Sequence, residues 1–173
     1  MNEGKKFEEQ FKASLIKDNF LVIRLPDPPQ SFNMGDSMLR FANKNPYDLV
    51  VYKNPNLYCL ELKSNKSKSI SIQFNKQEKG KDIKLHQIDG LTKASQNKGV
   101  RSGFILNYRS TNNTYYLDIK DFNEFLRTSS KKSINENDVS KNGVLIPQTQ
   151  IRVKYYYDFK RVVELKKEDK YAT

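Results

Sequence analysis

The sequence predicts an α/β domain whose central mixed β-sheet is flanked by helices. Some segments repeat apolar residues at helical spacing, whereas others are short runs rich in β-branched and aromatic residues. Along the chain the two kinds follow the order helix, several strands, helix, two strands, helix. At 173 residues the chain is long enough to bury a hydrophobic core, and we expect a single domain over residues 1–173.

The first element is predicted to be a helix over residues 3–18. Phe7, Phe11 and Leu15 recur every four residues and give this helix a single apolar stripe, which would face the core. Residues 20–25 are apolar apart from one arginine and predict a strand after the helix. A proline-rich turn follows directly, so the strand must end there.

An insert without a clear period occupies residues 26–47. Long irregular segments in a small domain are usually functional or disordered. The central part, residues 30–44, contains too many large apolar side chains for plain disorder. We therefore expect a loop or protruding, stalk-like element that packs against something, with nucleic acid as one partner.

Two β-rich runs flank an Asn-Pro-Asn sequence, which is good turn material. If the loop has four residues, Tyr52 pairs with Leu57 and Asp48 lies opposite Glu61. Side chains of a strand alternate between faces, so Glu61 and Lys63 then share one face with Asp48. A loop of three residues would place Asp48 on the other face, because a shift of one residue reverses every side chain. A common site therefore requires an even-length loop or a bulge.

The rest of the chain alternates between helix and strand signals. A helix over residues 83–96 carries apolar residues at helical spacing and ends near a glycine. The remaining expectations are strands at 70–74, 102–108, 114–119 and 151–157, loops at 75–82 and 140–143, a helix at 121–128, a capping box at 133–136 and a basic helix or tail at 160–170.

A strongly basic composition favours a polyanionic partner. The formal net charge is +11 and the isoelectric point is about 9.6. Nucleic acid is the first partner that such an excess predicts, and a solvated basic surface is the alternative. Arg40, Lys44, Lys66 and Lys68 bracket the hairpin with positive charge and are the candidates for DNA binding through phosphate contacts.

The composition also excludes several classes of protein. No apolar run approaches the roughly 20 residues that span a bilayer, so we expect no membrane partner. The polar residues 1–6 do not form a signal peptide, which favours a cytoplasmic protein. One cysteine and one histidine exclude an internal disulfide, a cysteine-based zinc site and a histidine cluster, and leave hard ions with oxygen ligands.

The hairpin carries residues suited to phosphodiester hydrolysis. Mg²⁺ prefers a few carboxylates together with waters and substrate oxygens, so Asp48 and Glu61 are the predicted metal ligands, with Mn²⁺ as a substitute. One or two such ions generate a nucleophilic water and stabilise charge on the attacked phosphate. The ammonium of Lys63 would orient or deprotonate the water, or neutralise the developing charge. The alternative is an exposed Glu-x-Lys pair at a strand edge.

Two helices offer further catalytic candidates. Glu8 and Glu9 on the first helix are the candidates for a third acid, although from spacing alone solvent exposure near the helix start explains them better. Gln87 on the middle helix would position a water or a phosphate, with an exposed polar patch as the alternative. Its neighbour His86 is a less favoured candidate for a general base.

In this order along the chain, these residues resemble the PD-(D/E)XK nuclease superfamily, and in particular the RecU-type Holliday junction resolvases of Gram-positive bacteria and their phages. Glu8 resembles the acidic residue of the family's N-terminal helix. Tyr47-Asp48 resembles its first metal-binding aspartate, and Glu61-Leu62-Lys63 its Glu-x-Lys. His86-Gln87 and the strand behind their helix resemble the family's His-Gln pair and following strand.

The resemblance implies a restriction-endonuclease-like domain. It also implies a homodimer that binds four-way DNA junctions and cuts two strands symmetrically with Mg²⁺ or Mn²⁺. It makes Glu8, Asp48, Glu61, Lys63 and Gln87 the catalytic set. In the family a stalk lies between the first strand and the metal aspartate, and the insert described above occupies that place but is shorter and different in composition. These departures suggest a phage version.

Three functions stay open at this point. The first is a metal-dependent endonuclease that resolves Holliday junctions. The second is a related nuclease for duplex or flap DNA, which a competition between junction and duplex would distinguish. The third is a non-catalytic junction-binding protein on the same scaffold, which predicts salt-sensitive binding without Mg²⁺-dependent cleavage. The intact Asp48, Glu61 and Lys63 argue against this third function.

Overall fold

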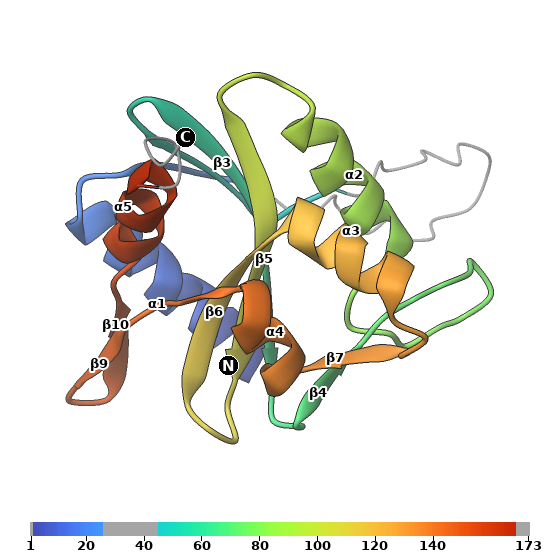
Figure 1. Cartoon of the computed structure of the whole chain (residues 1–173). Coiled ribbons are helices and arrows are strands. Elements are labelled where there is room, and N and C mark those ends of the chain that lie inside the picture. The colour runs from blue at the N-terminus through green and yellow to red at the C-terminus, as the bar shows by residue number, and fades with distance from the viewer. Residues whose placement is uncertain (1, 26–44, 169–173) are drawn as a thin grey trace, which may run out of the picture.

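The structure is a computed structural model that describes residues 2–25 and 45–168, and its centre is a six-stranded sheet (Figure 1). In spatial order the strands are β1 (Leu21–Arg24), β2 (Leu49–Lys53), β3 (Asn56–Asn65), β5 (Val100–Tyr108), β6 (Asn113–Asp118) and β8 (Val144–Leu145). The predicted strands at 20–25, 102–108 and 114–119 therefore exist, with ends that differ by a few residues.

Strand β3 is the place where the pairing of the sheet changes direction. It runs antiparallel to β2 and parallel to β5, with Leu57 opposite Val100, and every other neighbouring pair in this sheet is antiparallel. A parallel pair requires a crossover connection, and here the chain between the two strands includes helix α2 (Leu85–Ser95). The sheet is mixed, as the sequence predicts.

Helices cover both faces of the sheet (Figure 1). One face carries α1 (Glu3–Lys17), α5 (Lys160–Glu168) and a hairpin of β9 (Gln148–Ile151) and β10 (Lys154–Tyr157). The other face carries α2, α3 (Ile119–Thr128), α4 (Glu136–Asn142) and a small sheet of β4 (Ser69–Ser71) and β7 (Ser133–Asn135). The predicted fold class, a central mixed sheet flanked by helices, is confirmed.

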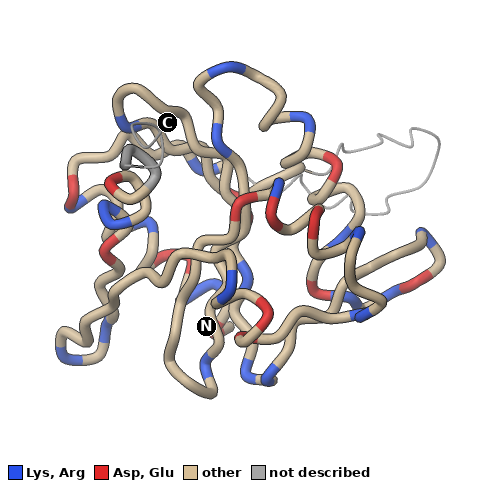
Figure 2. Tube along the Cα trace, viewed as in Figure 1, with Lys and Arg blue, Asp and Glu red and all other residues tan. Residues whose placement is uncertain are grey.

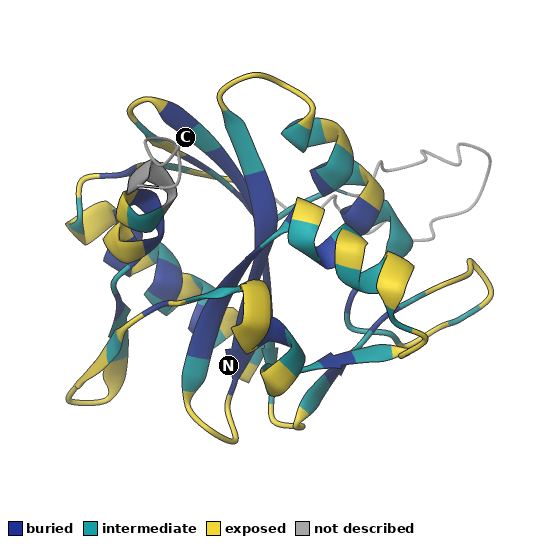
Figure 3. Ribbon diagram, viewed as in Figure 1, coloured by how far each residue is buried: buried dark blue, intermediate teal, exposed yellow. Residues whose placement is uncertain are grey.

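Each face of the sheet belongs to its own hydrophobic core. Phe11 and Leu15 of α1 pack in the first core, and Leu91 of α2 packs in the second. Successive residues of β3 alternate between the two, since Leu60 lies in the first core and Cys59 in the second. Figure 3 shows the buried residues concentrated along the central strands and the exposed residues on the turns.

The hairpin of β2 and β3 has the register that a shared site requires. Tyr52 pairs with Leu57, as predicted, but the ladder continues one pair further to Lys53 and Asn56. The loop therefore has two residues instead of four. Its length is still even, so the side-chain faces are those expected from the sequence. Leu49 pairs with Leu60, which places Asp48 opposite Glu61 at the start of β2.

Three predicted elements differ in the C-terminal third. The capping box uses Asn135 and Asp138 instead of Ser133 and Glu136, because Ser133 pairs with Ser71 in the β4–β7 sheet. Helix α4 then continues to Asn142, through most of the predicted loop. The predicted strand at 151–157 is a hairpin, since the chain reverses at Arg152, which has a φ of 56°.

Part of the predicted insert lies outside the described residues. The stalk-like role of residues 26–47, and with it the DNA-binding candidates Arg40 and Lys44, falls largely in the range 26–44, which the structure does not describe. Among the helices that are described, none is both long and apolar enough to cross a bilayer.

Candidate active site

Asp48 enters the site from the start of β2. Its backbone N–H donates to the carbonyl of Leu60 at 3.0 Å, which continues the β2–β3 ladder by one step. Its carboxylate oxygen Oδ2 accepts a hydrogen bond from the backbone N–H of Leu62 at 2.8 Å. The Asp48 side chain is thus fixed against the segment Glu61-Leu62-Lys63, as the predicted register requires.

Glu61 is the most deeply buried carboxylate of the site, with 2% of its surface exposed. Its Oε1 lies 2.8 Å from Nζ of Lys63 on the same face of β3. The pKa of Glu61 is raised to about 7, mainly by burial and in part by the charges of Asp48 and Glu8, while Lys63 lowers it. An exposed Glu-x-Lys pair at a strand edge is therefore wrong for this chain: β3 is a central strand, and the glutamate is inside.

Gln87 connects the crossover helix to this glutamate. Its Nε2 donates to Oε1 of Glu61, and its Oε1 accepts from the backbone N–H of Lys84 at 2.9 Å. The residue lies in the first turn of α2 and is buried, so the alternative of an exposed polar patch is wrong. The same side chain caps the start of α2 and holds Glu61.

Glu8 approaches the site from helix α1. It lines a pocket of about 250 Å³ together with Asp48, and its charge raises the pKa of Glu61. Its Oε2 lies 3.6 Å from Nη2 of Arg24. Glu9 also lines the pocket, although its side chain is exposed. Of the two candidates for a third acid, Glu8 is the one whose charge reaches Glu61.

The predicted DNA-binding lysines lie at the end of the strand that carries the site. Lys66 and Lys68 are exposed in the turn between β3 and β4, a few residues beyond Lys63. Basic positions are otherwise spread over helices and turns on several sides of the molecule (Figure 2). The overall basic charge is thus not gathered in one described element.

The donor set suits a hard divalent ion. Within residues 2–25 and 45–168, no three His, Cys, Asp or Glu side chains form a group that could hold a metal by themselves. Asp48 and Glu61 instead offer two carboxylates, and a buried carboxylate next to other acids gains from a cation that neutralises it. Mg²⁺ commonly binds through one or two carboxylates and keeps several waters. The residues therefore fit such an ion.

Two residues that support the site were not singled out from the sequence. Arg24 at the end of β1 pairs with Glu8. Gly90 of α2 faces Pro46 so closely that a Cβ on Gly90 would lie 2.2 Å from Pro46 Cβ. The available signal was a glycine inside a predicted helix. Alanine is the better helix former, so a glycine at such a position indicates close packing against another segment.

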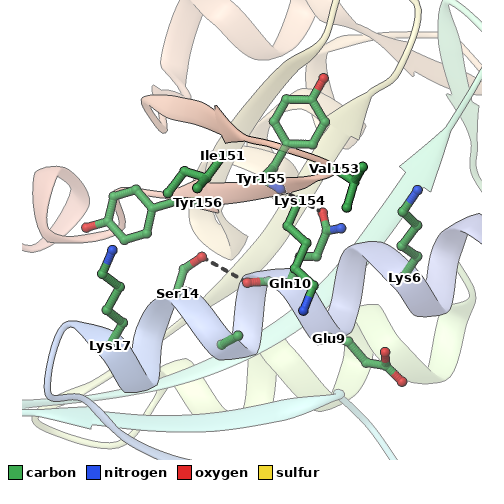
Figure 4. Close-up of a pocket in the computed structure, with 11 residues that line it drawn as sticks. Lys6, Glu9, Gln10, Ser14, Lys17, Ile151, Val153, Lys154, Tyr155 and Tyr156 are labelled. Carbon is green, nitrogen blue, oxygen red and sulfur yellow. Dashed lines mark hydrogen bonds between the residues drawn. The ribbon is translucent and has the colours of Figure 1, made fainter.

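A separate groove of about 430 Å³ lies between α1 and the β9–β10 hairpin (Figure 4). Val153 and Ile151 expose apolar side chains beside it, and Lys6 and Lys17 of α1 line it. Nζ of Lys17 lies 4.9 Å from the centroid of the Tyr156 ring, in a cation–π contact. Among the residues that line the groove, only Glu9 also lines the pocket of Asp48, so the two cavities use different sides of α1.

Comparisons with known proteins agree with this architecture. The structure of Hjc from Archaeoglobus fulgidus, a Holliday junction resolvase from an archaeal hyperthermophile, superimposes with a TM-score of 0.52. The alignment covers 82% of this chain and 95% of Hjc, at 17% sequence identity. At this identity the likeness is one of fold, and the chain has the restriction-endonuclease-like α/β fold.

Sequence comparison then gives the family. The family model of RecU, Recombination protein U, matches residues 73–161. The SPbeta prophage-derived uncharacterized protein YotM of Bacillus subtilis strain 168 is 32% identical over 149 residues, which cover 84% of this chain and 71% of YotM. The chain belongs to the RecU family. The family match begins after Lys63, so it includes Gln87 but not Asp48 or Glu61.

Proposed function

We propose that this chain is a metal-dependent Holliday junction resolvase, which cuts two opposed strands of a four-way DNA junction. The observation that carries the proposal is the meeting of Asp48, Glu61 and Lys63 at a change of pairing direction in a RecU-family fold. A homodimer belongs to the same proposal, because paired symmetric cuts require two active sites. We also propose a cytoplasmic location, where the DNA substrate is found.

Asp48 and Glu61 are the residues that would hold Mg²⁺ or Mn²⁺. When bound, the ion supplies an acidified water and neutralises charge on the phosphate. Lys63 lies beside Glu61, and its ammonium orients the water or stabilises charge that develops on the phosphate oxygens. Glu8 assists from α1, because its charge already acts on Glu61.

Gln87 acts through Glu61. Its amide donates to one carboxylate oxygen and thereby fixes the orientation of the other. Partners of this kind orient metal-binding carboxylates, and their mutation typically lowers metal affinity or activity by about 10- to 100-fold. We assign to Gln87 the role of a positioning residue for Glu61, instead of direct contact with a water or phosphate.

The test is a cleavage assay on a labelled four-way junction and a linear duplex of matching sequence, with Mg²⁺, with Mn²⁺ and with EDTA. We expect paired symmetric nicks on the junction alone, lost in EDTA and in Asp48→Asn. Asp89→Asn, at an exposed position on α2, is the matched control and should cut normally. Full cleavage by Asp48→Asn would contradict the assigned site.

The same assay distinguishes the alternative functions. Equal cutting of the duplex would keep the nuclease and discard the junction selectivity. Tight, salt-sensitive binding without cutting would indicate a non-catalytic junction-binding protein. Sedimentation of the free protein tests the dimer, which should have twice the chain mass of 20.2 kDa.

A further inference from the structure

The pocket beside Asp48 is lined by cations that the catalytic assignment leaves without a role. Lys5 and Lys12 of α1 and Arg24 of β1 line it together with the acids Glu8, Glu9 and Asp48. Lys5 and Lys12 are seven residues apart, which puts them on one side of the helix two turns from each other. The rise of a helix separates them by about 10 Å, which is about three phosphate-to-phosphate steps of one DNA strand along the duplex axis.

The three cations are not equivalent. Arg24 is engaged by Glu8 at 3.6 Å, whereas neither Lys5 nor Lys12 forms an ion pair with a described residue. Lys5 is exposed and Lys12 half-buried, so both ammonium groups can be reached from the pocket. Arg24 therefore orients Glu8, and the two lysines remain available for an anion.

Helix α1 sends lysines to both of its sides. Lys6 and Lys17 line the apolar groove against the β9–β10 hairpin instead (Figure 4). Lys154 lines that groove as well, but Ile151 and Val153 add exposed apolar surface and no candidate metal ligand adjoins it. The chain thus offers two lysine pairs on one helix, of equal charge, of which only one adjoins the candidate metal ligand.

We infer that Lys5 and Lys12 form a phosphate subsite that holds the backbone of the DNA strand next to the phosphate to be cut. This inference rests on the proposed nuclease function, because it takes DNA as the occupant of the pocket. The subsite reads charge and spacing and no bases, as is general for phosphate contacts. By binding neighbouring phosphates, the two lysines fix the position of the DNA strand relative to Asp48. This position determines which phosphate lies at the candidate metal ligands.

The test measures binding of a labelled four-way junction to Asp48→Asn protein by fluorescence anisotropy, between about 50 and 200 mM salt. The double variant Lys5→Ala/Lys12→Ala should lower the slope of log affinity against log salt by about 2, one for each lost phosphate contact. The matched control, Lys6→Ala/Lys17→Ala, removes the same charge from the same helix and should change the slope by less than about 0.5. Circular dichroism checks that both variants fold.

Equal losses in the two double variants would overturn the subsite, because net charge alone would then explain binding. An unchanged slope in Lys5→Ala/Lys12→Ala would overturn it as well, even if the wild type cuts junctions. If the wild type cuts no DNA but the slope falls only in Lys5→Ala/Lys12→Ala, the two lysines do bind DNA phosphates, whereas the proposed nuclease function fails and with it the placement of this subsite beside a phosphate to be cut. The two failures can therefore be distinguished.

Discussion

The burial of Glu61 lowers the stability of the folded protein and at the same time favours metal binding. A carboxylate that is 2% exposed loses the hydration that favours its charge, and Lys63 compensates only in part, since the pKa stays raised to about 7. Such a group gains from any cation that replaces the lost water. The burial that weakens the folded protein is thus what makes the residue a suitable metal ligand.

The pKa of Glu61 predicts how stability depends on pH. Because the folded pKa exceeds the unfolded value of about 4.5, this group's stabilising contribution is complete below that value and is lost as the pH rises through about 7. Glu61→Gln should therefore be more stable than the wild type at about pH 8, by up to about 3 kcal/mol, with little gain at about pH 4. Urea unfolding in EDTA at both pH values measures the difference.

Glu124→Gln is the control for this prediction, since Glu124 lies exposed on α3, where it pairs with Arg127. Its effect should change by no more than about 1 kcal/mol between the two pH values, because an exposed ion pair contributes little to stability. A wild-type protein that equals or exceeds Glu61→Gln in stability at about pH 8 would contradict the assigned burial of an ionised carboxylate. Cleavage by Glu61→Gln should be lost in either case.

Removal of Gln87 tests its role as a positioning residue. Gln87→Ala leaves Glu61 without its amide donor, so affinity for Mn²⁺ and junction cleavage should each fall by about 10- to 100-fold. Metal binding is measured by the Mn²⁺-dependent rise in melting temperature of the protein alone. Gln96→Ala, exposed at the other end of the same helix, should change neither quantity. Cleavage lost with unchanged Mn²⁺ binding would instead favour contact of Gln87 with water or phosphate.

At the scale of elements, helix α2 fixes the point at which the chain returns to the sheet. Pro46 lies two residues before Asp48 and packs directly on Gly90 of α2. A methyl group at Gly90 would lie 3.2 Å from the Cα of Pro46 and closer still to its Cβ. The helix therefore sets the position of Asp48 from one side, while the hydrogen bond from Leu62 sets it from the other.

Gly90→Ala should destabilise the protein, although alanine is by itself the better helix former. We expect a loss of about 1–3 kcal/mol in urea unfolding from overpacking against Pro46, together with reduced junction cleavage. In a Pro46→Gly background the contacts with the proline ring are gone and the 3.2 Å contact with the Cα of residue 46 remains, so the destabilisation by Gly90→Ala should be clearly smaller than in the wild type.

Gly4→Ala in α1 is the matched control for this prediction. A Cβ there would meet only Oδ1 of Asn2, at an ordinary 3.7 Å, so alanine should stabilise the helix. Destabilisation of equal size by Gly90→Ala with and without Pro46 would show that the contact is not its cause.

Local patterns in the sequence were sufficient for most elements and for the pairing of Tyr52 with Leu57, although the predicted loop of four residues has two. The stripe of Phe7, Phe11 and Leu15 gives α1, and parity of the loop gives the shared face of Asp48 and Glu61. The shift of the capping box from Ser133 to Asn135 could not be predicted from the local sequence, because it depends on the pairing of Ser133 with β4. The contact of Gln87 with Glu61 depends likewise on how α2 packs across the parallel strands.

At the scale of the whole molecule, one sheet serves two cores. Leu60 and Leu62 of β3 contribute to the core under α1, and Cys59 contributes to the core under α2. Neither core can be lost without removing the partners of residues in the other, since neighbouring positions of the same strands supply both. We therefore expect the described part of the chain to fold as one cooperative unit.

We expect the protein to unfold in a single transition. Circular dichroism follows the helices, and tyrosine fluorescence follows the tyrosines, which lie in both cores while the sequence contains no tryptophan. The two signals should give one midpoint in urea. Separate midpoints would indicate that the two layers, and with them Gln87 and Asp48, are stabilised independently.

The contacts of the site differ in how far apart their partners lie along the chain. Asp48 and Leu62 are 14 residues apart within one hairpin, whereas Glu61 and Gln87 are 26 apart and depend on a crossover. Closing the short loop loses less chain entropy, so we expect the two carboxylates to meet early in folding and Gln87 to dock later. Substitutions in the hairpin would then slow folding, whereas substitutions at Gln87 would mainly speed unfolding.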